Sequence, residues 1–201
     1  MASSDTEICN MALGHLMVDN DISELSTERS LEARSCRKYY ETVRSQVLRD
    51  FPWPFAKRLV TLALVEEDPS DEWAYSYRYP SDCLMLRRIL SGTRNDSRDT
   101  RVPYLETGDD TGKLIYTDME DAVMEYTKRI TDVQVYPDDF VMMLTLRLSA
   151  VIAPQVTGGD PFKLGVQALQ KYMMELRLAR GNAASEEQPE ENSEAEWIRG
   201  R

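Results

Sequence analysis

Histidine and cysteine are scarce in this chain, which has one histidine and three widely separated cysteines among its 201 residues. Nucleophilic catalysis commonly uses histidine as the base, and zinc sites need clustered Cys and His ligands. His15 has no Ser or Cys nucleophile motif beside it, and no two cysteines have metal-ligand spacing. The sequence therefore predicts no histidine-based active site, no metal site and no cofactor. The cysteines, Cys9, Cys36 and Cys83, are expected to be reduced, buried and apolar in character.

Long apolar runs and an excess of positive charge are also missing. No apolar stretch approaches the roughly 18 residues of a membrane-spanning helix, so we expect no contact with a membrane. Residues 1–10 have neither the basic start nor the apolar run of a secretory signal, so we expect the chain in the cytoplasm where it is made. The net charge of −11 argues against a surface that grips DNA, because such a surface needs Lys and Arg to displace counterions from phosphates.

Helical periodicity is strong at both ends of the chain. Apolar residues recur at helical spacing over residues 5–17, 27–50 and 160–180, and from residue 137 onward. In the last segment the expected apolar stripe comprises Phe162, Val166, Leu169, Met173 and Leu176. Two methionine pairs, 142–143 and 173–174, indicate adaptable packing in a core or at an interface.

A proline-aromatic segment, FPWPF, ends the second helical pattern. Pro52 and Pro54 cannot continue a helix, and they favour extended geometry in the residues before them. Phe51, Trp53 and Phe55 are expected to anchor this corner in the core.

A different pattern fills residues 59–129, where short apolar or aromatic runs alternate with turn-rich stretches. It predicts a small antiparallel sheet of about five or six strands. Its core is expected to contain the aromatic residues of one strand: Trp73, Tyr75, Tyr77 and Tyr79. Residues 108–113, GDDTGK, have the wrong glycine spacing for a phosphate loop and are expected to form a hairpin turn. Residues 95–97 match a glycosylation acceptor, a chance match in a chain without a secretory signal.

The predicted fold class is therefore mainly α with inserted β (α+β): a bundle of about four helices plus a small antiparallel β subdomain. Residues 1–58 are expected to form the first helical pair, residues 59–131 the β subdomain, and residues 132–180 the second helical pair. Residues 181–201 hold six acidic residues and two arginines. Such a segment cannot bury enough apolar surface to offset its chain entropy, so we expect this acidic tail to be disordered alone.

Three residues near the C-terminus differ from the rest of the acidic tail. Trp197 and Ile198 lie beside Arg199, and a segment that only adds solubility has no need of them. Aromatic and arginine side chains are typical anchors of protein interfaces. The tail is therefore either a short docking motif or an inert segment.

Paired carboxylates are the one catalytic chemistry that the composition leaves open, because two of them can act as acid and nucleophile in glycoside cleavage. The candidates lie in turns or at a predicted helix start, where acidic residues are common without a catalytic role. They are Glu66, Glu67, Asp68, Asp109, Asp110, Asp138 and Asp139.

Four stretches, taken in order, carry a resemblance that covers most of residues 5–155. Residues 7–16, EICNMALGHL, are similar to the family's starting helix. Residues 32–58 match best, with Ala and Cys before a Tyr-rich helix that ends in Leu-Arg, an aromatic residue and Pro-Trp. Residues 73–84 are aromatic-rich and close in Pro-x-Asp-Cys, and residues 126–132, YTKRITD, match the approach to the third helix. On these motifs the chain resembles the ring-forming head-to-tail adaptor of short-tailed bacteriophages, the tail tubular A or gatekeeper family.

The resemblance implies a structural virion protein and not an enzyme. About a dozen copies would form a ring through heterologous contacts, made in the host bacterial cytoplasm and built into the tail at the portal vertex. This ring would dock beneath the portal protein and connect to the tail nozzle protein and, in many members, to tail fibres or spikes. Double-stranded DNA would pass through without sequence-specific binding, which an acidic lining favours. Because the C-terminal segment of such adaptors often becomes ordered on the portal, Trp197 and Ile198 would be docking anchors.

Two other functions remain open from the sequence. One is a tail-associated peptidoglycan hydrolase that uses paired carboxylates, an activity proposed within this family. The other is a non-viral acidic module for protein interactions, which would stay monomeric and ignore portal protein.

Overall fold

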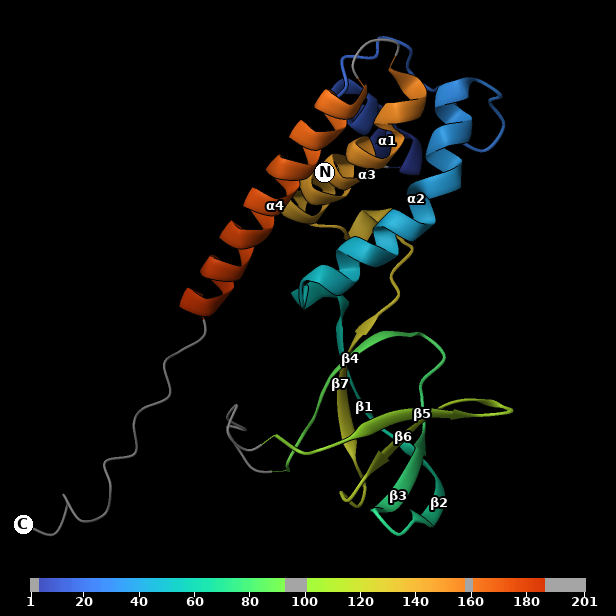
Figure 1. Ribbon diagram of the computed structural model, residues 1–201, viewed down its shortest axis with the longest axis vertical. Coiled ribbons are helices and arrows are strands. Elements are labelled where there is room, and N and C mark those ends of the chain that lie inside the picture. The colour runs from blue at the N-terminus through green and yellow to red at the C-terminus, as the bar shows by residue number, and fades with distance from the viewer. Residues whose placement is uncertain (1–3, 93–100, 158–160, 187–201) are drawn as a thin grey trace, which may run out of the picture.

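The structure, a computed structural model, describes residues 4–92, 101–157 and 161–186 of the chain. Over these residues four α-helices gather at one end, and two small antiparallel sheets lie at the other (Figure 1). The helices are α1 (Asp5–Gly14), α2 (Leu31–Asp50), α3 (Asp138–Val156) and α4 (Pro161–Glu186). All the described strands lie between α2 and α3 in sequence, which confirms the predicted α+β class.

Serine caps and acidic first turns set where the helices begin. Ser4 caps α1, its Oγ accepting a hydrogen bond from the Glu7 N–H at 3.2 Å. Ser30 caps α2 by accepting from the Ala33 N–H at 3.2 Å, so α2 begins four residues later than its periodicity predicts. Helix α3 follows Pro137 with two aspartates in its first turn, where the helix dipole favours negative charge.

Helix α3 lies at the centre of the helical part and packs against α1, α2 and α4. The apolar core that these helices share includes Ile8, Leu13, Val43, Val47, Phe140, Leu144, Leu148, Ile152 and Tyr172. By length and composition alone α3 could cross a bilayer, which differs from our expectation from the sequence. More than half of its most apolar stretch is buried inside the protein, so we interpret α3 as a core helix.

The face of α4 that packs on α3 differs from the predicted apolar stripe. Gly165 and Tyr172 are buried there, and a Cβ atom at Gly165 would lie only 3.2 Å from the carbonyl oxygen of Ala150. This close approach turns Val166 and Met173 outward, so the predicted stripe is wrong at these two positions. The remaining predicted residues whose side chains are described, Leu169 and Leu176, are half-buried against the core.

Helix α4 also reaches the C-terminal end of α2. The Tyr172 hydroxyl donates a hydrogen bond of 2.5 Å to the Asp50 carboxylate, and Arg180 donates one of 2.9 Å to the Asp50 carbonyl oxygen. The helix then continues to Glu186, so the first six residues of the predicted tail are helical and not disordered.

The described strands form two sheets instead of the single predicted sheet, with the orders β1-β7-β4 and β2-β3-β6-β5 and only antiparallel pairing. They are β1 (Lys57–Thr61), β2 (Ala63–Ser70), β3 (Trp73–Arg78), β4 (Cys83–Ile89), β5 (Leu105–Asp109), β6 (Gly112–Thr117) and β7 (Val123–Lys128). These seven strands are more than we predicted. The apolar run 59–65 resembles one strand, but it is interrupted at the buried Leu62, so β1 joins one sheet and β2 the other.

Both sheets contribute to a second apolar core, made of Leu62, Tyr77, Leu86, Ile89, Ile115, Ala122, Met124 and Tyr126. Of the four aromatic residues predicted for this core, Tyr77 is buried, and its hydroxyl donates to the Met119 carbonyl at 2.8 Å. Tyr75 and Tyr79 are half-buried against the core. Trp73 is half-buried at the start of β3 and lies outside that cluster.

Arg87 of β4 connects the β region to the helices. Its Nη2 donates to the carbonyl oxygens of Leu48, Arg49 and Phe51 at 3.0–3.1 Å, and its Nε donates to the Thr127 hydroxyl at 2.8 Å. Carbonyls at a helix C-terminus lack helical partners, and positive charge is favoured beside them. The guanidinium therefore caps α2 from the β region.

Candidate functional site

The acidic residues considered as a catalytic pair are spread over the molecule. The exposed run 66–68 lies on β2, at one edge of the four-stranded sheet. Asp109 and Asp110 lie at the other edge, three strand spacings of about 4.8 Å away and also shifted along the strands, since Glu67 aligns with Thr117 of β6 and Asp109 with Gly112. Asp138 and Asp139 begin α3 in the helical part. Glycosidase carboxylates lie about 5–9.5 Å apart, and the structure brings no two of these three groups together in that way.

Asp109 stabilises the hairpin turn that the sequence predicts. It pairs with Gly112, so that residues 110–111 form a two-residue turn between β5 and β6, which confirms the predicted turn. Arg78 donates two hydrogen bonds of 3.0 Å to the Asp109 carboxylate, and Thr111 donates through its N–H and its hydroxyl. These hydrogen bonds lower the pKa of Asp109 below its usual range. A catalytic acid needs a raised pKa.

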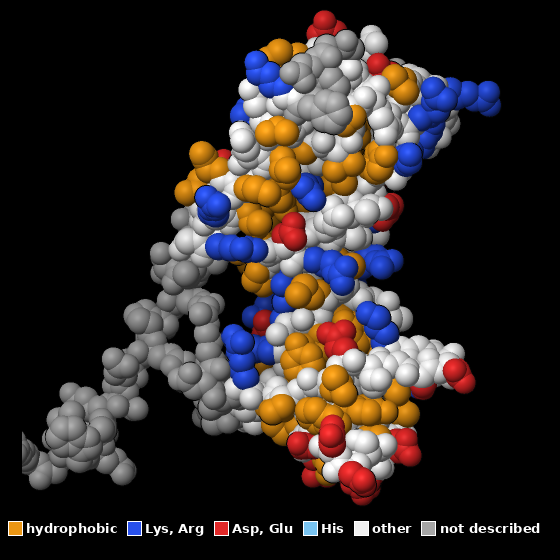
Figure 2. All heavy atoms as spheres, in the orientation of Figure 1, with side chains coloured by type: hydrophobic (Ala, Val, Ile, Leu, Met, Phe, Trp, Pro, Cys, Tyr) orange, Lys and Arg blue, Asp and Glu red, His pale blue; other side chains and the backbone are white. Residues whose placement is uncertain are grey.

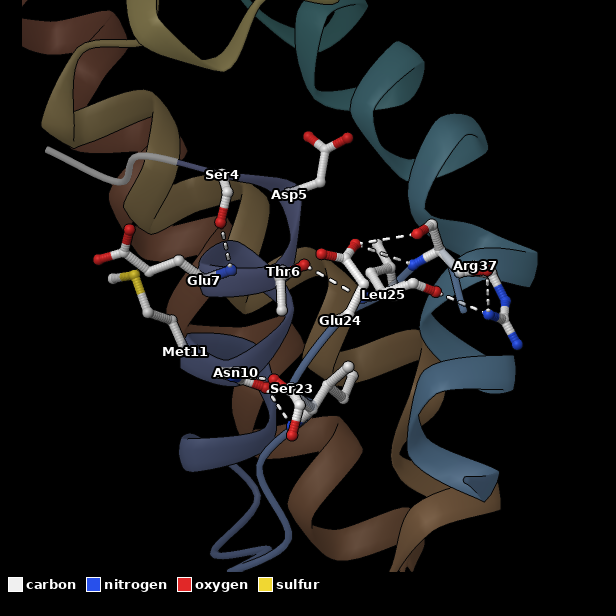
Figure 3. Close-up of a pocket in the computed structure, with 12 residues that line it drawn as sticks. Ser4, Asp5, Thr6, Glu7, Asn10, Met11, Ser23, Glu24, Leu25 and Arg37 are labelled. Carbon is white, nitrogen blue, oxygen red and sulfur yellow. Dashed lines mark hydrogen bonds between the residues drawn. The ribbon is translucent and has the colours of Figure 1, made fainter. Parts of the chain in front are cut away.

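A shallow groove of about 680 Å³ lies beside the start of α1 (Figure 3). It is bounded by α1, the loop of residues 22–26 and Arg37 of α2. Its polar groups bind one another: Arg37 donates to the Leu25 carbonyl at 2.7 Å, and Asn10 makes two hydrogen bonds, of 2.8 and 2.9 Å, with the backbone of Ile22. The described lining contains no histidine, cysteine or lysine, and two of its carboxylates are engaged: Asp5 accepts a hydrogen bond from the Tyr40 hydroxyl, and Glu24 accepts from Ser26. The groove residues therefore hold a loop in place.

His15 follows α1 and lies half-buried, with its Nε2 3.3 Å from the Thr145 hydroxyl of α3. Burial lowers the pKa of His15 below its ordinary value, and the positive charge of Lys171 lowers it further. The contact joins the end of α1 to the central helix.

We expect the protein to lose stability as the pH falls below about 6.5, the ordinary pKa of histidine. Because the folded-state pKa of His15 is lowered, the unfolded chain takes up the proton first and is stabilised by it. The stabilisation contributed by neutral His15 is fully present above the unfolded-state pKa, and it is lost as the pH falls toward the folded-state pKa. Urea midpoints from about pH 8 to about pH 5.5 measure it, with His15→Gln as the control. Since the chain has no other histidine, an equal decline in both proteins would contradict this prediction.

The outer side of α4 is an exposed face that combines apolar and basic side chains, and we call it the α4 face. Its apolar members, Val166, Met173, Met174 and Leu178, are 49–59% exposed. Its basic members are Lys163, Lys171 and Arg177. Figure 2 shows hydrophobic and basic side chains alternating along this helix. Clustered exposed apolar side chains of this kind mark interaction surfaces.

Negative charge gathers at the far end of the β region, where Figure 2 shows most of the acidic side chains of the visible face. The β2–β3 hairpin, residues 66–72, has five acidic residues and no basic one, and the turn at 118–121 adds three more. Residues 163–181 of α4, by contrast, have four basic residues and one acidic residue. The α4 face is therefore basic, whereas the far end of the β region is acidic.

The proline-aromatic corner lies where α2 ends. Phe51 and Trp53 are buried and Phe55 is half-buried. The exposed Pro52 and Pro54 direct the chain from α2 toward β1. This corner supports the fold and carries no exposed functional group.

The predicted docking residues Trp197, Ile198 and Arg199 lie outside the described residues. The same holds for the expected disorder of residues 187–201 and for the glycosylation match at 95–97. The α4 face is a candidate functional surface that the sequence alone did not predict. Its one sequence signal was the methionine pair 173–174, since methionines are typical of adaptable packing in a core or at an interface.

No family model matches this chain, and no curated protein matches it significantly. Across the described part of the chain, no three His, Cys, Asp or Glu side chains gather where they could hold a metal ion. The α4 face is thus the strongest candidate for a functional surface.

Proposed function

We propose that this chain is a structural head-to-tail adaptor of a short-tailed bacteriophage. In this role it forms a ring under the portal and connects the portal to the tail nozzle and its fibres. The observation that carries the proposal is the α4 face, a large exposed apolar and basic surface in a chain whose motifs resemble such adaptors. Burial of exposed apolar surface drives association, and the basic side chains add orientation.

The charge distribution supports heterologous contacts between subunits. A ring needs one face of a subunit to meet a different face of the next, whereas a two-fold dimer brings identical faces together. The α4 face is basic, so two copies of it repel each other, and the acidic β2–β3 hairpin repels its own copy in the same way. Contacts between unlike faces are therefore favoured over contacts between like ones.

Within this proposal the four helices act as one bundle that forms the body of the ring, and the β region projects from it. The acidic tail docks on the portal through Trp197, Ile198 and Arg199. The net charge of −11 suits a channel through which DNA slides without adhering, since like charges repel the phosphate backbone. The mature ring belongs to the virion tail at the portal vertex.

Mixing the purified chain with intact portal rings, followed by light scattering, tests the proposal. We expect a portal-dependent increase in mass that corresponds to about a dozen bound copies. A chain that ends at Glu186 keeps the whole of α4, so loss of binding by this chain alone would assign docking to residues 187–201. No mass increase with either chain would contradict the adaptor proposal and favour a monomeric interaction module.

We expect Leu178→Asp to weaken ring assembly on the portal by at least about tenfold, since a charge in a buried interface costs more than 1.4 kcal/mol. Leu59→Asp is the matched control, because Leu59 of β1 is 58% exposed and Leu178 is 55% exposed, and β1 lies in the other sheet from the acidic hairpin. Circular dichroism checks that both proteins remain folded. Equal assembly by the two variants, measured by light scattering, would exclude the α4 face as a subunit contact.

A further inference from the structure

Two of the three cysteines face each other in the helical core. Cys9 of α1 and Cys36 of α2 are both fully buried, and their thiols lie within hydrogen-bonding reach of each other. Cys83 lies on β4 in the β region, half-buried, and belongs to neither helix.

The register of the two helices explains why these thiols meet. Asp5 of α1 accepts a hydrogen bond of 2.7 Å from the hydroxyl of Tyr40 of α2. Cys9 lies one turn after Asp5, and Cys36 lies one turn before Tyr40, so antiparallel helices bring the two thiols together. The hydrogen bond thus places the pair independently of the thiols themselves.

The neighbouring residues allow the helices to come closer. Two of the buried neighbours on these faces are small, Ala12 of α1 and Ala33 of α2, while Leu13 of α1 is a larger buried neighbour of Cys9. A disulfide needs an S–S distance of about 2.05 Å and Cα atoms about 4.4–6.8 Å apart. Small residues beside the pair let α1, a helix of only ten residues, move toward α2.

We infer that Cys9 and Cys36 form a reversible disulfide that crosslinks α1 to α2 when the protein meets a small-molecule disulfide oxidant such as glutathione disulfide. This inference goes beyond the adaptor function and does not depend on it. The crosslink closes the connection between the two helices, including the loop that borders the groove in Figure 3. It is a covalent modification site on the helical part of the fold.

The exchange proceeds in two balanced steps. When α1 opens, the thiolate of Cys36 attacks one sulfur of the oxidant and releases one glutathione thiolate. Cys9 then loses its proton and attacks the sulfur of Cys36, which releases the second glutathione. Two protein S–H bonds and the oxidant S–S bond are broken, while one protein S–S bond and two glutathione S–H bonds form.

Burial makes this exchange slow and sets its order of events. Neither thiol has exposed surface in the folded state, so the oxidant can reach Cys36 only when α1 opens. In the folded state the contact with Cys36, burial and the nearby Asp5 carboxylate all raise the pKa of the Cys9 thiol. Opening exposes Cys36 on the helix that stays in place, so Cys36 attacks first and Cys9 resolves the mixed disulfide when α1 returns.

The test uses the full chain, equilibrated with reduced or with oxidised glutathione, then acid-quenched, unfolded and treated with N-ethylmaleimide. We expect mass spectrometry to find three labelled cysteines in the reduced sample and one, Cys83, in the oxidised sample. Peptide mapping should show Cys9 linked to Cys36, and dithiothreitol should restore all three labels. We expect the oxidised protein to unfold about 5–10 °C higher, because the crosslink restricts the unfolded chain.

Cys83→Ser is the matched control and should form the same crosslink, whereas Cys9→Ser should leave Cys36 either free or as a mixed disulfide with glutathione. Three labelled cysteines in the oxidised wild-type protein would overturn the inference. So would a bond that involves Cys83, or a crosslinked product that has lost its helical circular dichroism. The wild-type readout remains decisive even where a serine variant fails to fold.

Discussion

Trp53→Ala should lower the free energy of unfolding by about 3–5 kcal/mol, the cost of emptying a large aromatic site in a packed core. Trp53 is 1% exposed at the corner after α2. Its ring makes edge contacts with Phe51 and Phe140 at centroid distances of 4.9 and 5.1 Å, and its Nε1 donates to the Val47 carbonyl at 2.9 Å. It thus joins α2, the corner and α3 at one point. Urea unfolding followed by circular dichroism measures the loss.

Trp73→Ala is the matched control for this prediction. Trp73 is half-buried at the start of β3, and its indole Nε1 has no hydrogen-bond partner within the described structure. We expect it to lose less than about 2 kcal/mol, since less apolar surface returns to water. The loss of unfolding free energy for Trp53→Phe should lie between those for Trp53→Ala and Trp73→Ala, because this variant keeps an aromatic ring and loses the hydrogen bond to Val47. Equal losses of unfolding free energy for Trp53→Ala and Trp73→Ala would show that the corner contributes no more to stability than an ordinary half-buried aromatic residue.

Features set by nearby residues could be predicted from the sequence. Helical periodicity located all four helices, since it depends on residues three and four positions apart. The turn at residues 110–111 follows from local glycine and aspartate chemistry. Ser30 shows the limit of periodicity, because its side-chain cap starts α2 later than the apolar pattern alone indicates.

Features set by distant contacts could not be predicted. Leu62 lies within an apolar run, yet its N–H donates to the carbonyl of Ala122, and this long-range pairing divides the run between two sheets. On α4 the predicted stripe follows helical spacing, and so does a second set of residues, Ala168, Leu169, Tyr172 and Leu176. The contact of Gly165 with α3 decides between them, and periodicity contains no information about that contact.

The candidate site, too, depends partly on nearby residues and partly on distant contacts. The α4 face exists because Gly165 and Tyr172 take the buried positions and leave Met173 and Met174 outside. The sequence indicated methionines for adaptable packing in a core or at an interface, but it could not say which side of the helix would be exposed. The acidic candidates were named by residue type alone, and the sheet order places two of their groups at opposite edges.

Arg87→Ala should lower the free energy of unfolding by about 2–3 kcal/mol, because charge-assisted hydrogen bonds contribute about 1.5–3 kcal/mol. The substitution removes three hydrogen bonds to the last turn of α2 and one to Thr127. Arg87→Lys should recover only part of the loss, since an ammonium group cannot reproduce the planar fork of donors. Chemical denaturation measures both variants.

The distinguishing effect of Arg87→Ala is on cooperativity between the helices and the β region. α2 and β4 meet at this guanidinium, so its loss should let the β region open while the helices remain folded. Hydrogen exchange should then show faster exchange in β4 and β7 than in α2, whereas the wild-type elements open together. Arg49→Ala is the matched control, because Arg49 contributes a backbone carbonyl to the contact and its own side chain is exposed. If both variants lost equal stability, or if exchange in β4 and α2 rose together, the link between the two parts would lie in the apolar corner around Trp53 and not in Arg87.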